Sequence, residues 1–195
     1  MHKIIPEDAI LIPDKAEKVF TGMIYDVYQW EQANFDDSIT TFEMLKRPDT
    51  VIVMAIIDDS LVVLEDEQPH RGMILAFPGG RIDPEDSDPL AAAKREMREE
   101  TGFEFANWRL VQIVQPQLKL EWFVYAFVAW DVTHEGDHSH EPGEKIKVLQ
   151  KSFAETKKLI NQGNLRDGNQ RLFEAMNSLE DLRNLTEFQG KTVER

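Results

Sequence analysis

The chain has 195 residues, a formal net charge of −14 and 42% hydrophobic residues. This length and composition suit one domain with a packed core. The negative charge argues against nucleic acid and anionic membranes as main partners, because phosphate backbones and anionic lipids are bound by surface Lys and Arg. Cysteine is absent, which excludes disulfides, thiolate metal sites and a cysteine nucleophile. The first residues lack the apolar run of a signal peptide and no segment reaches the length of a membrane span, so we expect a cytoplasmic protein.

The N-terminal stretch predicts an arm followed by a small β-rich segment. Residues 1–15 have two prolines and little periodicity, which indicates an arm. Residues 19–30 are rich in β-branched and aromatic side chains, and residues 39–46 resume a strand pattern after a polar turn. We therefore expect a separate N-terminal segment at residues 1–47 and the main domain at residues 48–195.

Two apolar runs predict the centre of the main sheet. Residues 51–57 are almost entirely apolar, which indicates a buried central strand. Residues 61–65 return as its hairpin partner after a short acidic turn. Further strands are expected at residues 108–115 and 121–131.

A glycine loop, an acidic turn and a helix follow at residues 79–103, and the rest of the sequence is organised around them. Asp88 is a suitable N-cap, and Pro89 suits the first helical position. Gly102 can end the helix in a left-handed conformation. The apolar residues expected to face the core are Leu90, Ala93 and Met97.

Three carboxylates share one flank of this predicted helix, those of Glu96, Glu99 and Glu100. They repel one another unless they are neutralised, and a hard divalent cation such as Mg²⁺ does this with oxygen ligands. Arg95 lies one turn before Glu99 and can orient it, and the preceding glycine pair lets the backbone approach a ligand or metal. The alternative is a solvated helix held by Glu–Arg pairs. The complete pattern favours a metal-dependent phosphate site.

The polar stretch at residues 133–145 predicts a flexible acidic loop. Its three histidines, His134, His138 and His140, raise the alternative of a zinc site, but the loop offers no rigid frame for zinc ligands. The favoured interpretation is that the loop carries a glutamate to the metal centre, as a general base acting on bound water. The other alternative is a solvated surface loop.

The C-terminal region predicts two helices. Residues 152–155 form a capping box, so one helix begins there and ends near Gly163. A second helix, capped by Asp167 or Asn169, has apolar residues at helical spacing. Residues 190–195 are expected to fray.

Residues 95–103, Arg-Glu-Met-Arg-Glu-Glu-Thr-Gly-Phe, resemble the core of the Nudix box, which runs Arg-Glu-apolar-any-Glu-Glu-any-Gly-apolar. Gly80 resembles the glycine that opens the box, with one residue more than usual before the arginine. The upstream glutamate of the box would fall at Ser87, so either Glu85 or Asp86 substitutes for it or the role is absent.

This resemblance implies an α/β (α+β) fold in which a mixed β-sheet lies between helices. It also implies hydrolysis of a nucleoside diphosphate linked to another moiety, with Mg²⁺ as the cofactor and Mn²⁺ as the alternative ion. The implied metal ligands are Glu96, Glu99, Glu100 and the backbone carbonyl of Gly79.

Within the family, the layout is most similar to the ADP-ribose pyrophosphatase branch. Two segments, one ending at Arg71 and one at residues 144–148, resemble segments of that branch. They imply Glu144 as the catalytic base, with Glu141 in reserve. The branch is usually dimeric through its N-terminal sheets, where an aromatic side chain stacks on the substrate base. Trp30 is the candidate for this stacking, and a packing role within its strand is the alternative.

The resemblance therefore implies a Mg²⁺-dependent pyrophosphohydrolase that converts ADP-ribose or a nucleotide sugar to a nucleoside monophosphate and a sugar phosphate. The alternatives are a coenzyme A or dinucleotide pyrophosphatase and a catalytically inactive nucleotide sensor. The expected partners are a small nucleoside diphosphate and a second copy of the chain, as a homodimer. The implied catalytic residues are Arg95, Glu99 and Glu144, and the implied substrate-binding residues are Trp30, Arg71 and Gly80.

Overall fold

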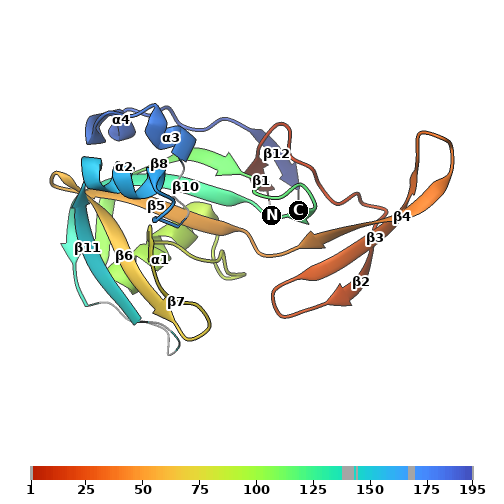
Figure 1. Cartoon of the computed structure of the whole chain (residues 1–195), viewed down its shortest axis with the longest axis horizontal. Helices are drawn as coiled ribbons and strands as arrows, with labels where there is room; N and C mark the ends of the chain where they lie inside the picture. The colour runs from red at the N-terminus through yellow and green to blue at the C-terminus, as the bar shows by residue number, and fades with distance from the viewer. Residues whose placement is uncertain (1, 138–142, 144, 167–169, 195) are drawn as a thin grey trace. The chain divides into compact units, whose positions relative to one another are not determined.

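The computed structural model describes residues 2–137, 143, 145–166 and 170–194. The strands are β1 (His2–Ile5), β2 (Glu17–Thr21), β3 (Asp26–Ala33), β4 (Ile39–Lys46), β5 (Thr50–Ile57), β6 (Ser60–Gln68), β7 (Gly72–Ala76), β8 (Phe103–Val114), β9 (Leu120–Glu121), β10 (Val124–Glu135), β11 (Lys145–Ser152) and β12 (Lys191–Glu194). The helices are α1 (Pro89–Thr101), α2 (Phe153–Asn161), α3 (Gln170–Glu174) and α4 (Leu179–Arg183) (Figure 1).

The chain forms two compact units. The first unit comprises Met1–Thr50, Ile113–Val124 and Gln189–Arg195, and the second unit comprises Val51–Gln112 and Tyr125–Phe188. The first unit contains the N-terminal segment expected from the sequence, together with two pieces from later in the chain. The predicted division of the sequence into two domains after residue 47 stays a prediction.

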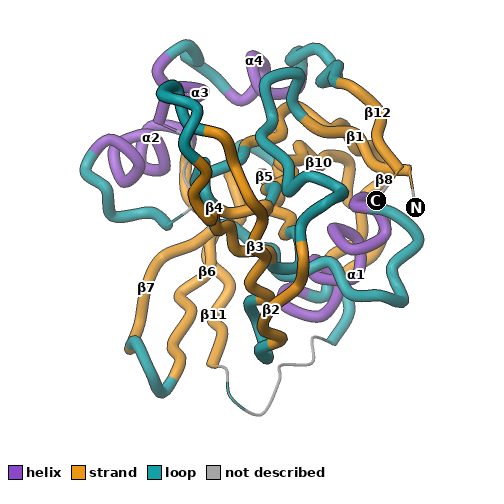
Figure 2. The backbone as a smooth tube through the Cα atoms, turned by 90° about the vertical axis from the view of Figure 1, so that its right-hand side faces the viewer, coloured by secondary structure: helices purple, strands orange, loops and turns teal. Residues whose placement is uncertain are grey.

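A six-stranded sheet forms the centre of the second unit. Its strands run in the order β11-β6-β5-β10-β8, with β7 paired to β6. Helix α1 lies on one side of this sheet, and α2 and α3 lie on the other (Figures 1 and 2). Every residue of β5 from Val51 to Ile57 is buried, because apolar side chains point from both faces of the strand. The predicted fold class, a mixed sheet between helices, is confirmed.

The first unit contains a four-stranded sheet of order β2-β3-β4-β9 and a two-stranded sheet of β1 and β12. Two expectations are wrong here. The stretch expected to be an arm contains β1, and the C-terminal stretch expected to fray contains β12. These strands pair antiparallel with Ile4 opposite Thr192, and Ile5 is completely buried. Local patterns missed this pairing because it joins opposite ends of the sequence.

A buried carboxylate holds three segments of the first unit together. The Glu121 side chain is 0% exposed and accepts hydrogen bonds from Lys46 Nζ at 2.7 Å and from the Ile12 amide at 2.8 Å. A buried charge is tolerated only when it is paired and hydrogen-bonded. This residue therefore links the end of β4, the N-terminal stretch and β9.

The C-terminal helices differ in part from the prediction. Helix α2 has the expected capping box at Ser152. The predicted second helix is two short helices, because Ser178 forms a new capping box with Asp181 and begins α4. The predicted caps Asp167 and Asn169 lie outside the described residues. Among the helices that the structure describes, none is long and apolar enough to cross a membrane.

Candidate active site

Helix α1 begins and ends as the sequence predicted. Asp88 Oδ1 accepts a hydrogen bond from the Ala91 amide at 2.8 Å, and Pro89 occupies the first turn. Gly102 ends the helix with φ 75°, and a Cβ there would lie 2.1 Å from the Gly136 carbonyl oxygen. Of the three residues expected to face the core, Ala93 and Met97 are buried, whereas Leu90 in the first turn is only half-buried. The buried side chains of the helix are Ala92, Ala93, Met97 and Thr101.

The glycine loop lies against both the central strand and the carboxylates of α1. The Gly79 amide donates to Glu100 Oε2 at 2.8 Å. Gly79 has φ 145°, and a Cβ there would lie 2.1 Å from the Val51 carbonyl oxygen. A Cβ at Gly80 would lie 2.4 Å from Glu96 Oε1. Gly79 therefore requires glycine, whereas a side chain at Gly80 would displace the flexible end of Glu96. The loop places its backbone next to two of the predicted metal ligands.

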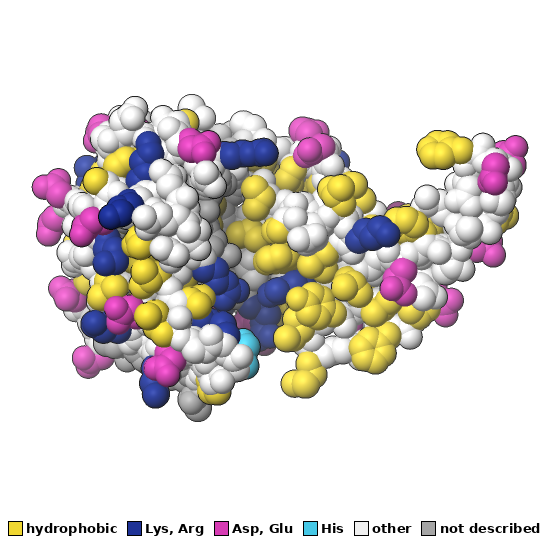
Figure 3. Space-filling view, in the orientation of Figure 1, with side chains coloured by type: hydrophobic (Ala, Val, Ile, Leu, Met, Phe, Trp, Pro, Cys, Tyr) yellow, Lys and Arg dark blue, Asp and Glu magenta, His cyan; other side chains and the backbone are white. Residues whose placement is uncertain are grey.

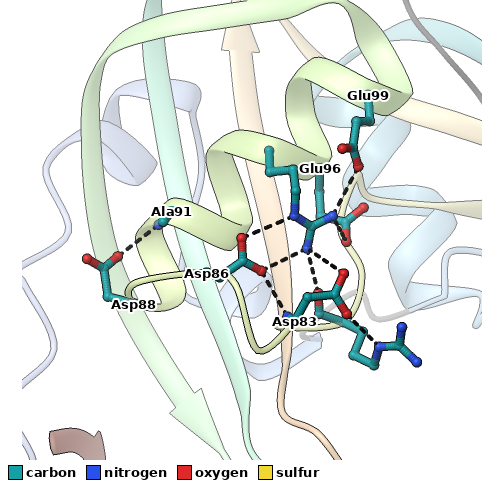
Figure 4. A network of polar contacts seen from close by, with 8 residues as sticks. Asp83, Asp86, Asp88, Ala91, Glu96 and Glu99 are labelled. Atoms are coloured by element: carbon teal, nitrogen blue, oxygen red, sulfur yellow. Dashed lines mark hydrogen bonds and ion pairs between the residues drawn. The ribbon is translucent and has the colours of Figure 1, made fainter. Parts of the chain in front are cut away.

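Arg95 is the centre of the polar network on this flank. Its Nη1 donates to Glu96 Oε1 and to Glu99 Oε2, both at 3.0 Å. Its Nε and Nη2 donate to the two carboxylate oxygens of Asp86 at 3.1 and 2.9 Å, and Nη2 also donates to the Arg81 carbonyl at 2.9 Å. Figure 4 shows these acidic side chains pointing toward the same guanidinium group. One cation thus holds the carboxylates in place.

Asp86, and not Glu85, pairs with the arginine of the box. Asp86 is buried, whereas Glu85 is exposed. Asp86 Oδ2 also accepts a hydrogen bond from the Asp83 amide at 2.9 Å, and this bond closes the acidic turn. Hydrogen bonds from Arg95 hold the pKa of Asp86 below its ordinary value. The sequence had left the choice between these two neighbours open, because both are acidic and both precede the helix cap.

Asp83 is a further member of the network that the sequence did not single out. Its Oδ2 lies 3.6 Å from Arg95 Nη2, and its Oδ1 accepts from Arg81 Nε at 2.8 Å. The only available signal was the acidic composition of the turn. That composition does not say which carboxylate reaches the arginine.

Burial changes the protonation of Glu96. Loss of water around its carboxylate raises its pKa from 4.5 to about 7, although the neighbouring Arg95 acts in the opposite direction. The hydrogen bonds that Arg95 donates to Asp86 raise the pKa of Arg95, which stays charged. Glu96 therefore takes up a proton near neutral pH unless further positive charge lies beside it.

The donor chemistry of this flank fits a hard cation. Glu96, Glu99 and Glu100 offer carboxylate oxygens, and the glycine loop brings backbone into direct contact with the first and last of them. In the part of the chain that the structure describes, however, no three acidic or histidine side chains are grouped closely enough to hold a metal ion as they stand. Glu96 and Glu99 are turned to Arg95 instead.

Two of the remaining predicted site residues, Arg71 and Trp30, have contacts of their own. Arg71 donates to the Asp66 carboxylate and carbonyl within the β6–β7 hairpin, so its guanidinium is occupied there. Trp30 on β3 packs against Phe42 on β4, with ring centroids 5.0 Å apart. Glu144 lies outside the described residues, as do Glu141, His138 and His140.

Comparison with known proteins identifies the family of the chain. The chain matches the family described as the NUDIX domain over residues 46–176, which is more than half of its length. The chain therefore belongs to the Nudix family, and the resemblance seen at residues 95–103 is confirmed.

Two curated relatives match part of the chain at low identity. An ADP-ribose pyrophosphatase of Bacillus subtilis (strain 168) is 27% identical over 89 residues, which is 45% of this chain and 48% of the relative. A methanol dehydrogenase activator of Bacillus methanolicus is 27% identical over 106 residues, which is 53% of this chain and 55% of the relative. The chain thus spans about half the length of the curated relatives it matches.

A solved structure supports the fold. The crystal structure of an ADP compounds hydrolase superposes with a TM-score of 0.66 and 22% sequence identity. The match covers 88% of this chain and 92% of that chain. At this identity the likeness concerns the fold alone.

The pairing of Asp86 with Arg95 is open to a direct test. We expect Asp86→Asn to lower the free energy of unfolding by about 2 kcal/mol, because charge-assisted bonds to Arg95 are lost in a half-buried network. Urea unfolding measures this change. The matched control is Glu85→Gln, which removes an exposed neighbouring charge and should change stability by less than about 0.5 kcal/mol. Equal effects of the two variants would contradict the assignment.

The raised pKa of Glu96 predicts a specific pH dependence in the metal-free protein. Between its unfolded pKa of 4.5 and its folded pKa of about 7, the folded state holds a proton that the unfolded chain releases. The contribution of Glu96 to the free energy of unfolding is therefore complete below its unfolded pKa of 4.5, and it is lost as the pH rises through its folded pKa of about 7. Relative to Glu96→Gln, the wild type should lose about 2–3 kcal/mol between about pH 5 and about pH 8. Urea unfolding in EDTA at several pH values measures this loss of stability. If the stabilities of the two proteins change in parallel with pH, the raised pKa of Glu96 is refuted.

Proposed function

We propose that this protein is a Mg²⁺-dependent pyrophosphohydrolase. Its proposed substrate is a nucleoside diphosphate linked to another moiety, either ADP-ribose or a nucleotide sugar, and its products are a nucleoside monophosphate and a sugar phosphate. One observation carries the proposal, namely the carboxylate flank of α1, organised by Arg95 beside a glycine loop. Family membership and the names of two similar proteins, an ADP-ribose pyrophosphatase and an ADP compounds hydrolase, support it.

Four oxygen donors would hold the metal ion, which is Mg²⁺ or, as the alternative, Mn²⁺. They are the carboxylates of Glu96, Glu99 and Glu100 and the backbone carbonyl of Gly79. When bound, the ion neutralises the charge of the diphosphate and lowers the pKa of bound water.

The chain's own residues have separable roles in this proposal. Arg95 holds Glu96 and Glu99 on the flank of α1, and both carboxylates would have to turn away from it to bind the ion. Gly80 presents backbone without a side chain where the diphosphate must come close. Glu144 serves as the general base that takes the proton of the attacking water. Trp30 and Arg71 are proposed to contact the base and the phosphates.

The metal-binding carboxylates give the sharpest test of this function. We expect Glu100→Gln to lower kcat by about a hundredfold or more. The fold should survive, because an amide oxygen can still accept from the Gly79 amide. The measurement is AMP formation from ADP-ribose with Mg²⁺, beside ADP-glucose, coenzyme A and dinucleotides. The control is Glu104→Gln, which removes an exposed carboxylate paired with Arg98 near the same helix.

Each outcome of this assay separates the alternatives. A folded and fully active Glu100→Gln protein would refute the metal site. Faster turnover of coenzyme A or of a dinucleotide would support the metal site but would contradict ADP-ribose or a nucleotide sugar as the substrate. If a ligand raises the melting temperature of the wild type but no product forms, the chain is a nucleotide sensor.

We also infer that the chain forms a homodimer through its first unit. All five residues of β2, an edge strand, are exposed. Figure 3 shows hydrophobic side chains gathered over the part of the molecule formed by β2, β3 and β4. Apolar surface of this kind indicates an interaction site, and an unpaired edge strand can pair with another chain. The exposed large hydrophobic residues there are Val19, Phe20, Met23, Ile24, Tyr25, Phe35 and Ile39.

A double substitution tests this surface. We expect Phe20→Ser with Ile24→Ser to convert the dimer to a monomer, because about 25 cal/mol of burial free energy is lost for each Å² of apolar contact. Sedimentation velocity measures the molar mass. The control is Leu118→Ser, which removes an equally exposed apolar side chain of the same unit from outside this surface. A wild type that sediments as a monomer at every concentration would overturn the inference.

A further inference from the structure

A cavity of about 530 Å³ lies along one face of helix α2, in the second unit. Its size falls in the range of ligand pockets, which commonly occupy about 300–1,000 Å³. Most of its wall comes from α2 and the C-cap of that helix, and Asn177, next to the N-cap of α4, adds to it. The wall combines an aromatic ring, ammonium groups and carboxamides.

The charge of this wall is opposite to that of the whole protein. Among the residues that the structure describes, no carboxylate lines the cavity, although the chain has 36 acidic residues against 22 lysines and arginines. Two ammonium groups line it, those of Lys157 and Lys158. The carboxylates of Glu155 and Asp181, which are close in the sequence, are used in the capping boxes of α2 and α4. The wall is therefore positive, and such a wall attracts an anion.

Two side chains of the wall are held in place by contacts within the protein. Lys157 Nζ donates to the Met176 carbonyl at 2.5 Å, which uses one of the three N–H donors of the ammonium group. The Phe153 ring stacks on Phe173 with centroids 5.9 Å apart, and Phe173 stacks on Phe77 at 6.0 Å. The last two rings are buried, so the stack anchors Phe153 to the core. A wall that is already ordered lowers the entropic cost of binding a ligand.

We propose that this cavity binds a nucleoside monophosphate. A phosphate ester carries a charge of about −1.5 to −2 at neutral pH, which two ammonium groups match better than they match a single carboxylate. The carboxamides of Asn161, Gln162 and Asn177 each offer N–H donors and an oxygen acceptor, the combination that pairs with the edge of a base. The apolar surface of Phe153 suits the body of the nucleoside.

This cavity is separate from the candidate active site. Helices α1 and α2 lie on opposite sides of the central sheet (Figures 1 and 2). The residues that line the cavity include none of the proposed metal ligands Glu96, Glu99 and Glu100. The proposal therefore does not rest on the proposed function, and it gives the chain a nucleotide site that needs no metal ion.

Calorimetric titration of the full-length protein in EDTA tests this site without divalent cations. The probes are AMP, GMP, CMP and UMP, together with the corresponding nucleosides and inorganic phosphate as the separate parts of each. We expect saturable binding of at least one nucleotide. Its nucleoside and inorganic phosphate should each bind about tenfold more weakly or not at all, because each makes only part of the contacts.

Two substitutions in the wall and two controls locate the binding. Lys158→Gln and Asn161→Ala should each raise the Kd of that nucleotide by about threefold or more, since each removes one polar contact. Both side chains are exposed, so the fold should survive. Lys147→Gln, which removes a cation of β11 outside the cavity, should leave the Kd unchanged, and so should Glu100→Gln on α1.

Three results would overturn the proposal. The first is that no nucleotide gives saturable binding. The second is that a nucleoside or inorganic phosphate alone binds as tightly as the nucleotide. The third is that the two wall variants keep the Kd of the wild type, including the case in which Glu100→Gln abolishes binding and thereby assigns it to the candidate active site.

Discussion

The site depends on one guanidinium group. Glu96 and Glu99 stand on the same flank of α1, where two negative charges destabilise a helix and one of them is also withdrawn from water. Arg95 donates to both glutamates from Nη1, and its Nε and Nη2 donate to Asp86 and the Arg81 carbonyl. Because Asp86 is buried and fixed by the acidic turn, the arginine is held from one side and orders the glutamates on the other. Metal binding would therefore have to draw Glu96 and Glu99 away from the arginine that orders them.

The central strand sets the place of the glycine loop. The Val51 amide donates to the Gly80 carbonyl at 2.9 Å, and the Val53 amide donates to the Pro78 carbonyl at 2.8 Å. The loop is thus hydrogen-bonded to a strand that is buried from Val51 to Ile57, and the Gly79–Glu100 hydrogen bond links the loop to α1. Sites built on such rigid elements keep their geometry better than sites on free loops.

Local structure followed from the sequence wherever the signals were close together. The limits of α1, the capping box of α2 and the buried run of β5 all matched the expectations, because caps and apolar runs act over a few residues. The expectations failed where distant segments decide the outcome. The β1–β12 pair joins opposite ends of the chain, and the predicted last helix is divided at Ser178, where a second cap competes with continued helix.

The sequence alone determined the family and the composition of the site. Helical periodicity places Arg95, Glu96, Glu99 and Glu100 on neighbouring positions whatever surrounds them. Only the tertiary structure decided that Asp86 reaches the arginine while its neighbour Glu85 is exposed, and that burial raises the pKa of Glu96. Each of these depends on which segment packs beside the side chain. Desolvation and pairing are set by spatial neighbours, and the order of residues does not specify those neighbours locally.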